Sequence, residues 1–233
     1  RLMRAFLAVI LVFIPCALYS NQLFEWVSHP LLQQLPANSM LISTSITAPF
    51  TAPLKLAFVT ALVVAMPYVL YELWAFIAPG LYRHEKSFAV PLLLSAMVLF
   101  YVGVAFAYYV VFPLIFKFFV NTAPHGVQVM ADISNYMEFV LVLLFSFGIA
   151  FEVPVAVVLL VLMGLVPLEK LTQIRGYVLI AVFVIAAILT PPDAISQTVM
   201  AIPMYLLYEG GILFARLVAR SRAKQNPTQR NDA

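Results

Sequence analysis

The sequence predicts an all-α integral membrane protein with six transmembrane helices, several of them kinked by proline, that form a concave bundle. Of its 233 residues, 64% are apolar and only 10% are charged, whereas a soluble domain is about 25% charged. The apolar residues also occur in long runs. A chain this short cannot bury such runs in a soluble core, so they need lipid as their solvent.

Six apolar runs define the predicted spans, because a helix needs about 20 residues to cross the hydrocarbon layer. They cover residues 2–19, 53–76, 88–119, 136–166, 177–190 and 194–218. The third and fourth runs are long enough to tilt or protrude, whereas the fifth is short enough to thin the bilayer locally. We therefore expect one transmembrane domain over residues 1–219, followed by a polar, disordered tail over 220–233.

The first run resembles a signal peptide, with Arg1 and Arg4 ahead of it and small residues near its end. It is long for the apolar region of such a peptide, and further spans follow at once, so we expect it to be retained as the first span. The chain begins without a methionine, which indicates trimming at its front.

The basic residues predict an orientation with both termini on the cytoplasmic side. If the first run crosses from inside to outside, only Lys55 and Lys117 fall on the outer side. The inner side then holds eleven basic residues: Arg1, Arg4, Arg83, Lys86, Lys170, Arg175, Arg216, Arg220, Arg222, Lys224 and Arg230. This strong positive-inside bias supports six crossings, and five or seven spans would lose it.

The outer connections are more structured than linkers. Apolar residues at near-helical spacing follow the first run, and Trp26 among them suits an interfacial anchor. They predict a short helix on the outer surface, followed by an extended stretch over 36–53.

Proline recurs within the spans, where each one removes a backbone hydrogen bond and bends its helix. The five are Pro15, Pro67, Pro113, Pro154 and Pro203. So many bent helices favour a curved wall, although scattered kinks without a shared direction are the alternative.

Catalytic and cofactor motifs are absent from the sequence. It contains no Walker loop and no HExxH pattern, and its one cysteine, Cys16, lies inside the first run. The histidines His29, His84 and His125 all fall in predicted loops, so a buried Ser–His pair for intramembrane proteolysis is not available. We expect no enzyme activity, no cofactor and no metal, and we attribute the net charge of +3 to membrane orientation rather than to nucleic-acid binding.

Acidic residues in apolar runs are the first candidates for function. Glu152 lies within the fourth run, where a charge costs about 2.5–3.5 kcal/mol on insertion scales. It therefore marks either a polar point in a substrate groove or a helix-packing hydrogen bond beside Pro154. Glu72 and Glu209 fall near the inner ends of their runs, where an ordinary interfacial carboxylate is the simpler interpretation.

Glu85 is the sharpest candidate. It lies in the inner loop 78–86, which contains proline and glycine, just before the third run. A carboxylate held there suits a cationic ligand, and a guanidinium fits best because it makes two parallel charge-assisted hydrogen bonds. The competing interpretation is a local ion pair with Arg83 or Lys86.

Thr190 and Gln197 flank the tight outer turn between the last two runs. Polar side chains at such positions either hydrogen-bond to another membrane helix or cap the ends of their own helices.

Several motifs together give the chain a specific resemblance. They are Leu73–Lys86 (LWAFIAPGLYRHEK), Asn121–Val127 (NTAPHGV), Phe151–Val155 (FEVPV), Leu189–Gln197 (LTPPDAISQ) and Ala201–Tyr205 (AIPMY). In this order, over residues 1–219, the chain resembles the TatC family, the core subunits of the twin-arginine protein translocase. The family begins with a cytoplasmic acidic segment ahead of the first span, and Arg1 falls within or just after that segment.

The resemblance implies six spans, cytoplasmic termini, a cupped shape and export of folded proteins driven by the proton-motive force. It implies that Glu85 contacts the arginine pair of a signal peptide, within a site that also includes Phe76, Leu81, Arg83 and His84. Glu152 corresponds to the family's intramembrane glutamate, and Pro30 and Asp193 match functionally sensitive outer positions. The family's single-span partner subunits dock along the last two spans, where Thr190 and Gln197 fall, and a homo-oligomeric receptor complex is expected.

One rival from another class remains open. A small-solute or ion transporter that uses Glu152 as a proton site would also place a carboxylate inside the membrane. The inverted repeats common in such transporters are not visible in the sequence.

Overall fold

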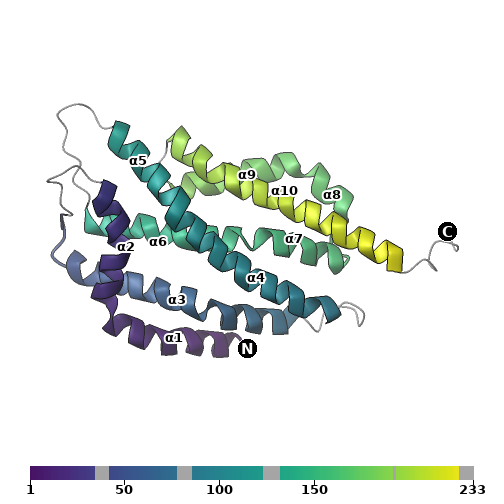
Figure 1. Cartoon of the computed structure of the whole chain (residues 1–233), viewed down its shortest axis with the longest axis horizontal. Coiled ribbons are helices and arrows are strands. Elements are labelled where there is room, and N and C mark those ends of the chain that lie inside the picture. Colours follow the sequence, from purple (N-terminus) through teal and green to yellow (C-terminus); the bar gives the residue numbers. More distant parts are fainter. Residues whose placement is uncertain (35–41, 78–85, 123–131, 191–192, 226–233) are drawn as a thin grey trace. The chain divides into compact units, whose positions relative to one another are not determined.

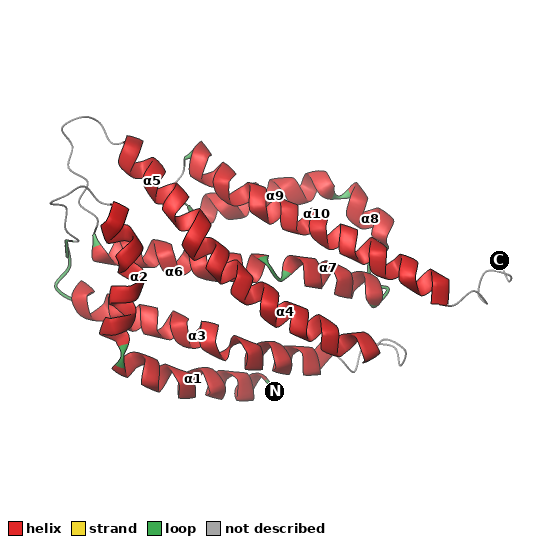
Figure 2. Cartoon of the chain, viewed as in Figure 1, coloured by secondary structure: helices red, strands yellow, loops and turns green. Residues whose placement is uncertain are grey.

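The structure is a computed structural model that describes residues 1–34, 42–77, 86–122, 132–190 and 193–225. Within these ranges the chain is helical with short connections (Figure 2). Among the described residues, a single isolated bridge joins Ile42 and Asp132. The elements in Figure 1 are α1 (Leu2–Leu18), α2 (Ser20–Gln34), α3 (Ala48–Ile77), α4 (Lys86–Phe106), the π-helix η2 (Ala107–Val111), α5 (Phe112–Thr122), α6 (Ile133–Ala150), α7 (Val153–Leu162), α8 (Leu168–Gln173), α9 (Arg175–Leu189) and α10 (Ala194–Gln225).

Four stretches of the described chain are helical, long and apolar enough to cross a membrane. They are Ala48–Phe76, Val90–Phe119, Ile133–Leu162 and Ala194–Arg220. A fifth candidate joins α1 to Ser20–Ser28, although the chain bends by 80° between these two helices. The predicted fifth run corresponds to α9, which has 15 residues. The all-α membrane class is therefore confirmed, while the count of six crossings and their orientation stay predictions.

The predicted prolines act in different ways. Helices α1, α3 and α10 continue through Pro15, Pro67 and Pro203. Just before Pro154 the helix is interrupted instead: Phe151 and Glu152 form a turn between α6 and α7. Pro113 lies two residues after the end of η2, and its missing N–H leaves the carbonyl of Tyr109 without the usual α-helical donor.

Contacts group the chain into two units, where the sequence predicted one domain over 1–219. The first unit comprises Arg1–Phe76 and Met97–Gly148, and the second comprises Ile77–Ala96 and Ile149–Ala233. The second boundary lies just before the turn at Phe151 and Glu152, where the predicted fourth span is interrupted.

The first unit has a core of large side chains from its spanning helices. Phe100, Phe112, Phe147 and Leu56 are fully buried in it. Aromatic rings join its helices: Phe13 of α1 meets Phe58 of α3 edge to face at 5.9 Å between centroids, and Phe112 of α5 meets Tyr136 of α6 at 5.8 Å. The predicted outer-surface helix is present as α2, and it contacts α1 and α5.

The second unit packs α7, α8 and α10 around an apolar cluster. Tyr208 of α10 lies in this cluster, and its hydroxyl donates a 2.7 Å hydrogen bond to the carbonyl of Leu171 near the end of α8. Gly211 lets α10 approach α7 closely, since a Cβ at this position would lie 2.8 Å from the Cα of Pro154.

The structure describes the first part of the predicted tail over 220–233 as helix. Helix α10 continues to Gln225, past the predicted boundary at 219. The extra residues include Arg222, Ala223, Lys224 and Gln225, which are good helix formers and extend a helix already anchored by packing. Residues 226–233 lie outside the described ranges.

Candidate functional site

The predicted guanidinium site lies mostly outside the described residues. Glu85 and its neighbours Leu81, Arg83 and His84 belong to segment 78–85, which connects α3 to α4. Phe76, one residue before the end of α3, is described, and its side chain is 73% exposed. An exposed aromatic ring at the end of a long apolar helix suits contact with lipid or with an apolar ligand segment.

Glu152 occupies the turn that separates α6 from α7. Its backbone carbonyl accepts the first hydrogen bond of α7, from Ala156 at 2.9 Å, but its side chain forms no cap for that helix. The side chain is half-buried, and its Oε1 atom is buried without a hydrogen-bond partner among the described residues. A packing hydrogen bond through Oε1 is thus not found within the described part of the chain. A buried oxygen of this kind is a polar point that water, a proton or a ligand can satisfy.

The helix ends that flank the predicted outer turn, on α9 and α10, each form a local hydrogen bond. Thr190 is 5% exposed, and its hydroxyl donates to the carbonyl of Ala186, one turn back on α9, at 2.8 Å. The Asp193 carboxylate accepts from the backbone N–H of Ser196 at 2.7 Å, which caps the start of α10. The side chain of Gln197 is half-buried. Of the two interpretations for Thr190, the one that the described contacts support is bonding within its own helix.

Pro30 lies within α2, where its missing N–H changes the hydrogen bonding of the helix backbone. Proline has no N–H, so the carbonyl of Trp26 four residues earlier loses its helical donor. The hydroxyl of Tyr108, from η2, donates to that carbonyl at 3.0 Å. Tyr136 of α6 donates to the adjacent carbonyl of Val27, also at 3.0 Å. Two tyrosines therefore attach α2 to other helices of the first unit through carbonyls about one turn before its proline.

The same pairing occurs inside a span. Pro67 removes the N–H that would serve the carbonyl of Val63 in α3, and the hydroxyl of Tyr101 donates to this carbonyl at 3.1 Å. Tyr101 and Tyr108 are seven residues apart on the continuous stretch formed by α4 and η2. Sequence reasoning noted the prolines but missed these donors, because nothing in the local pattern links a tyrosine to a proline far away in the chain.

The sequence also did not predict the partner of Glu209. Arg175, at the start of α9, contacts both oxygens of the Glu209 carboxylate, at 2.7 Å from Nε to Oε1 and 2.8 Å from Nη2 to Oε2. Tyr205 adds a hydroxyl at 3.0 Å from Oε1. Glu209 is therefore a paired group that ties α9 to α10, whereas an ordinary interfacial carboxylate was expected. Glu72 also has a tyrosine partner: it is 6% exposed, and its carboxylate accepts a hydrogen bond from the hydroxyl of Tyr68 at 3.0 Å.

Within the described ranges, His, Cys, Asp and Glu residues form no group of three that could hold a metal ion. The described residues thus form a helical membrane chain in which Oε1 of Glu152 and Oδ2 of Asp193 are buried without hydrogen-bond partners, Asp193 caps α10 and two tyrosines hold α2.

Comparison with known proteins identifies the family. The model of the Sec-independent protein translocase protein (TatC) family matches residues 1–203. The chain belongs to the TatC family. It is 50% identical to the Sec-independent protein translocase protein TatC of Escherichia coli K12 over 226 residues, which cover 97% of this chain and 88% of that one. The corresponding protein of Haemophilus influenzae is 49% identical over 216 residues, covering 93% and 84%.

A solved structure agrees with this assignment. The crystal structure of a twin-arginine translocase receptor, TatC, matches with a TM-score of 0.85 and 35% identity, covering 94% of this chain and 96% of that one. The TatC-family chain is thus a multi-pass membrane component of the Sec-independent protein translocase. None of these relatives supports the alternative of a small-solute transporter.

Proposed function

We propose that this TatC-family chain is the membrane receptor of its translocase and binds signal peptides that carry an arginine pair. The observation that carries the proposal is the family match over residues 1–203, which spans the inner loop with Glu85. In this role the chain exports folded proteins with energy from the proton-motive force.

In the proposed complex, Glu85 pairs with the signal peptide's guanidinium groups through two parallel charge-assisted hydrogen bonds. Arg83 and His84 lie beside it in the sequence and shape the polar part of the site. Leu81 and the exposed ring of Phe76 provide apolar contacts to the residues after the arginine pair. A Lys-Lys signal is bound less well, because an ammonium group cannot reproduce the planar bidentate contact.

Glu152 provides the proposed polar point for the apolar part of the signal peptide. Its Oε1 atom is buried without a partner among the described residues, so a peptide segment or water that reaches this turn would satisfy it. A neutral Glu152→Gln variant keeps hydrogen-bonding capacity and should bind better than Glu152→Leu.

The proposed partners are single-span subunits of the translocase and further copies of this chain. The single-span subunits dock along α9 and α10 around Thr190 and Gln197, where small and polar side chains suit helix contacts in lipid. Pro30 and Asp193 support the outer side, the first through the carbonyl that it frees in α2 and the second as the cap of α10. The chain lies in the bacterial cytoplasmic membrane with both termini inside.

Site-specific photocross-linking tests the receptor role. A photoreactive residue at position 82 or 87 should cross-link to a signal peptide with an arginine pair, and Glu85→Ala should weaken this product about tenfold, as expected for loss of a charge-assisted pair. Glu169→Ala is the matched control, because Glu169 is an exposed carboxylate in another predicted inner loop. Unchanged cross-linking in Glu85→Ala, or an equal loss in Glu169→Ala, would refute the role of Glu85.

A further inference from the structure

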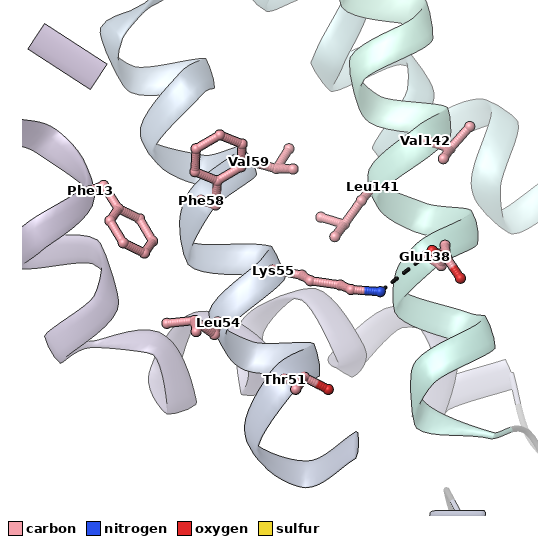
Figure 3. A pocket seen from close by; sticks show the side chains of 9 residues that line it. All are labelled: Phe13, Thr51, Leu54, Lys55, Phe58, Val59, Glu138, Leu141 and Val142. Atoms are coloured by element: carbon pink, nitrogen blue, oxygen red, sulfur yellow. Dashed lines mark hydrogen bonds and ion pairs between the residues drawn. The ribbon is translucent and has the colours of Figure 1, made fainter. Parts of the chain in front are cut away.

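An apolar groove opens on the first unit between α1, α3 and α6. Its volume is about 500 Å³, within the range of about 300–1,000 Å³ typical of small-molecule sites. Phe13 and Phe58 line one side and Leu141 lines the other (Figure 3). Phe58 is 47% exposed, so the groove is open to the surroundings of the helices rather than enclosed.

A charged pair crosses one part of this groove. Lys55 of α3 reaches toward Glu138 of α6, with Nζ 3.4 Å from Oε1 (Figure 3). Both side chains are more than half exposed, at 58% and 64%. An exposed ion pair with this separation contributes little to stability, so either partner can exchange its contact for a ligand's charge at small cost. Thr51, one turn before Lys55, places a hydroxyl-bearing side chain in the same lining.

The depth of the pair suits a lipid headgroup. The apolar stretch Ala48–Phe76 has 29 residues and is therefore about 44 Å long, close to the bilayer thickness of about 40–45 Å with headgroups. Lys55 lies about 10 Å from the start of α3 and Glu138 about 8 Å from the start of α6, at 1.5 Å per residue. Both therefore lie near the boundary between headgroups and hydrocarbon, with the apolar lining beside them.

We propose that this groove binds a zwitterionic phospholipid with an ethanolamine headgroup. Its phosphate accepts hydrogen bonds from the Lys55 ammonium and the Thr51 hydroxyl, its ammonium donates to the Glu138 carboxylate, and an acyl chain lies along Phe13, Phe58 and Leu141. The lipid comes from the leaflet on the side where α3 and α6 begin, which the distribution of basic residues predicts to be the outer one. The site is independent of signal-peptide binding.

Charge complementarity selects this lipid over other occupants. An anionic phospholipid satisfies Lys55, but it has no ammonium group to offset the repulsion between its phosphate and the Glu138 carboxylate. A choline headgroup carries no N–H and cannot donate to Glu138. A protein helix seated here would bury both charged side chains, and the desolvation of an ion pair offsets its attraction.

Lipid retention tests the proposal with the full chain. The protein is reconstituted in nanodiscs with equal amounts of phosphatidylethanolamine, phosphatidylcholine and phosphatidylglycerol, extracted gently, and its bound lipid is identified by native mass spectrometry. The unaltered chain should retain phosphatidylethanolamine over the other two. Glu138→Gln should reduce that preference about tenfold, as expected for loss of a charge-assisted hydrogen bond. Lys55→Gln should instead reduce the retention of phosphatidylethanolamine about tenfold, because it removes the contact to the phosphate that all three lipids share.

Two further variants make the test specific. Lys117→Gln removes the other predicted outer lysine, which is exposed on α5, and should leave the preference unchanged. Thr51→Val keeps the shape of the side chain and should weaken retention even if the charge variants fold poorly, which thermal unfolding of each variant checks. Equal retention of the three lipids, or enrichment of phosphatidylglycerol that depends on Lys55 alone, would overturn the proposal. So would an equal loss in Lys117→Gln, or a photoreactive group at Val142 that captures a protein instead of lipid in native membranes.

Discussion

Single side chains in this protein complete the backbone hydrogen bonding of distant helices. Tyr108 and Tyr101 each donate to a carbonyl that a proline has left without its helical N–H. In a membrane protein an unpaired carbonyl is costly where water is scarce. The proline and the tyrosine therefore act together: the proline leaves a carbonyl oxygen without its helical donor, and the tyrosine of another helix donates a hydrogen bond to that oxygen.

This couple can be tested by a double-mutant cycle. Tyr108→Phe should lower the free energy of unfolding by about 0.5–1.5 kcal/mol and speed hydrogen exchange in α2. Pro30→Ala restores the N–H for the Trp26 carbonyl, so in that background Tyr108→Phe should cost much less. Tyr109→Phe is the control, since that side chain is 75% exposed. Equal effects of Tyr108→Phe in both backgrounds would contradict the coupling.

Asp132 joins segment 42–47 to the start of α6. Its carboxylate accepts from the backbone N–H of Thr44 at 3.0 Å, from the Thr44 hydroxyl at 2.9 Å and from the N–H of Asn135 at 3.2 Å. These hydrogen bonds, with the Thr44 N–H as the largest cause, lower the pKa of Asp132 below its usual value. The folded state thus favours the ionised form, so the stabilisation is present above about pH 4 and is lost as the pH falls through the lowered pKa.

We therefore expect acid to loosen the attachment of segment 42–47 to the start of α6. Hydrogen exchange of Thr44 should rise below about pH 4, while helices within the membrane remain protected. Asp132→Asn should already exchange faster at neutral pH and should show little further change with acid. A variant that keeps the pH response of the unaltered chain would exclude Asp132 as its source.

At the scale of helices, close packing of α7 and α10 depends on one of two adjacent glycines. A Cβ at position 211 would lie 2.8 Å from the Cα of Pro154 and 3.1 Å from the Cβ of Val157, whereas one at position 210 would meet nothing within 4 Å. The neighbour at 211 is partly backbone, which cannot move aside as a flexible side chain can. The sequence contains both glycines, but it does not indicate which one faces α7.

Alanine substitution should separate the two positions. Gly211→Ala should destabilise the protein by about 1–3 kcal/mol, because overpacking forces the helices apart. Gly210→Ala should be neutral or stabilising by up to about 1 kcal/mol, the helix propensity that alanine adds. Thermal unfolding in detergent measures both, and a greater loss in Gly210→Ala would show that the α7–α10 contact is described wrongly.

At the scale of the whole molecule, the sequence predicted most of the helices but not their connections through side chains. Runs of apolar residues predict helices because only a helix satisfies its own backbone in lipid. The bounds shifted where local chemistry decides them: α6 begins at Ile133, directly after the capping Asp132, and α3 begins at Ala48. The pair of Arg175 and Glu209 could not be predicted, since 34 residues separate its members and only tertiary packing brings them together.

The same limit applies to the candidate site. Glu152 could be singled out from the sequence alone, because a charged side chain in an apolar run is costly to insert into a membrane and is therefore expected to have a function or a polar partner. Only the structure shows that its Oε1 atom has no hydrogen-bond partner within the described ranges. The role proposed for Glu85 is based on the residue types around it in the sequence and on the family match. It also requires segment 78–85 to face the cytoplasm.

The orientation of the helices is the central claim, and single-cysteine labelling tests it most directly. In a Cys16→Ser background, cysteines replace Ser43, Glu169, Ala194 and Gln225 one at a time and meet a membrane-impermeant maleimide added to intact cells. We predict labelling at positions 43 and 194 from outside, and at 169 and 225 only after the membrane is opened. Labelling of 169 and 194 from the same side would show that α9 does not cross, and it would contradict the six-span orientation that puts Glu85 on the cytoplasmic face.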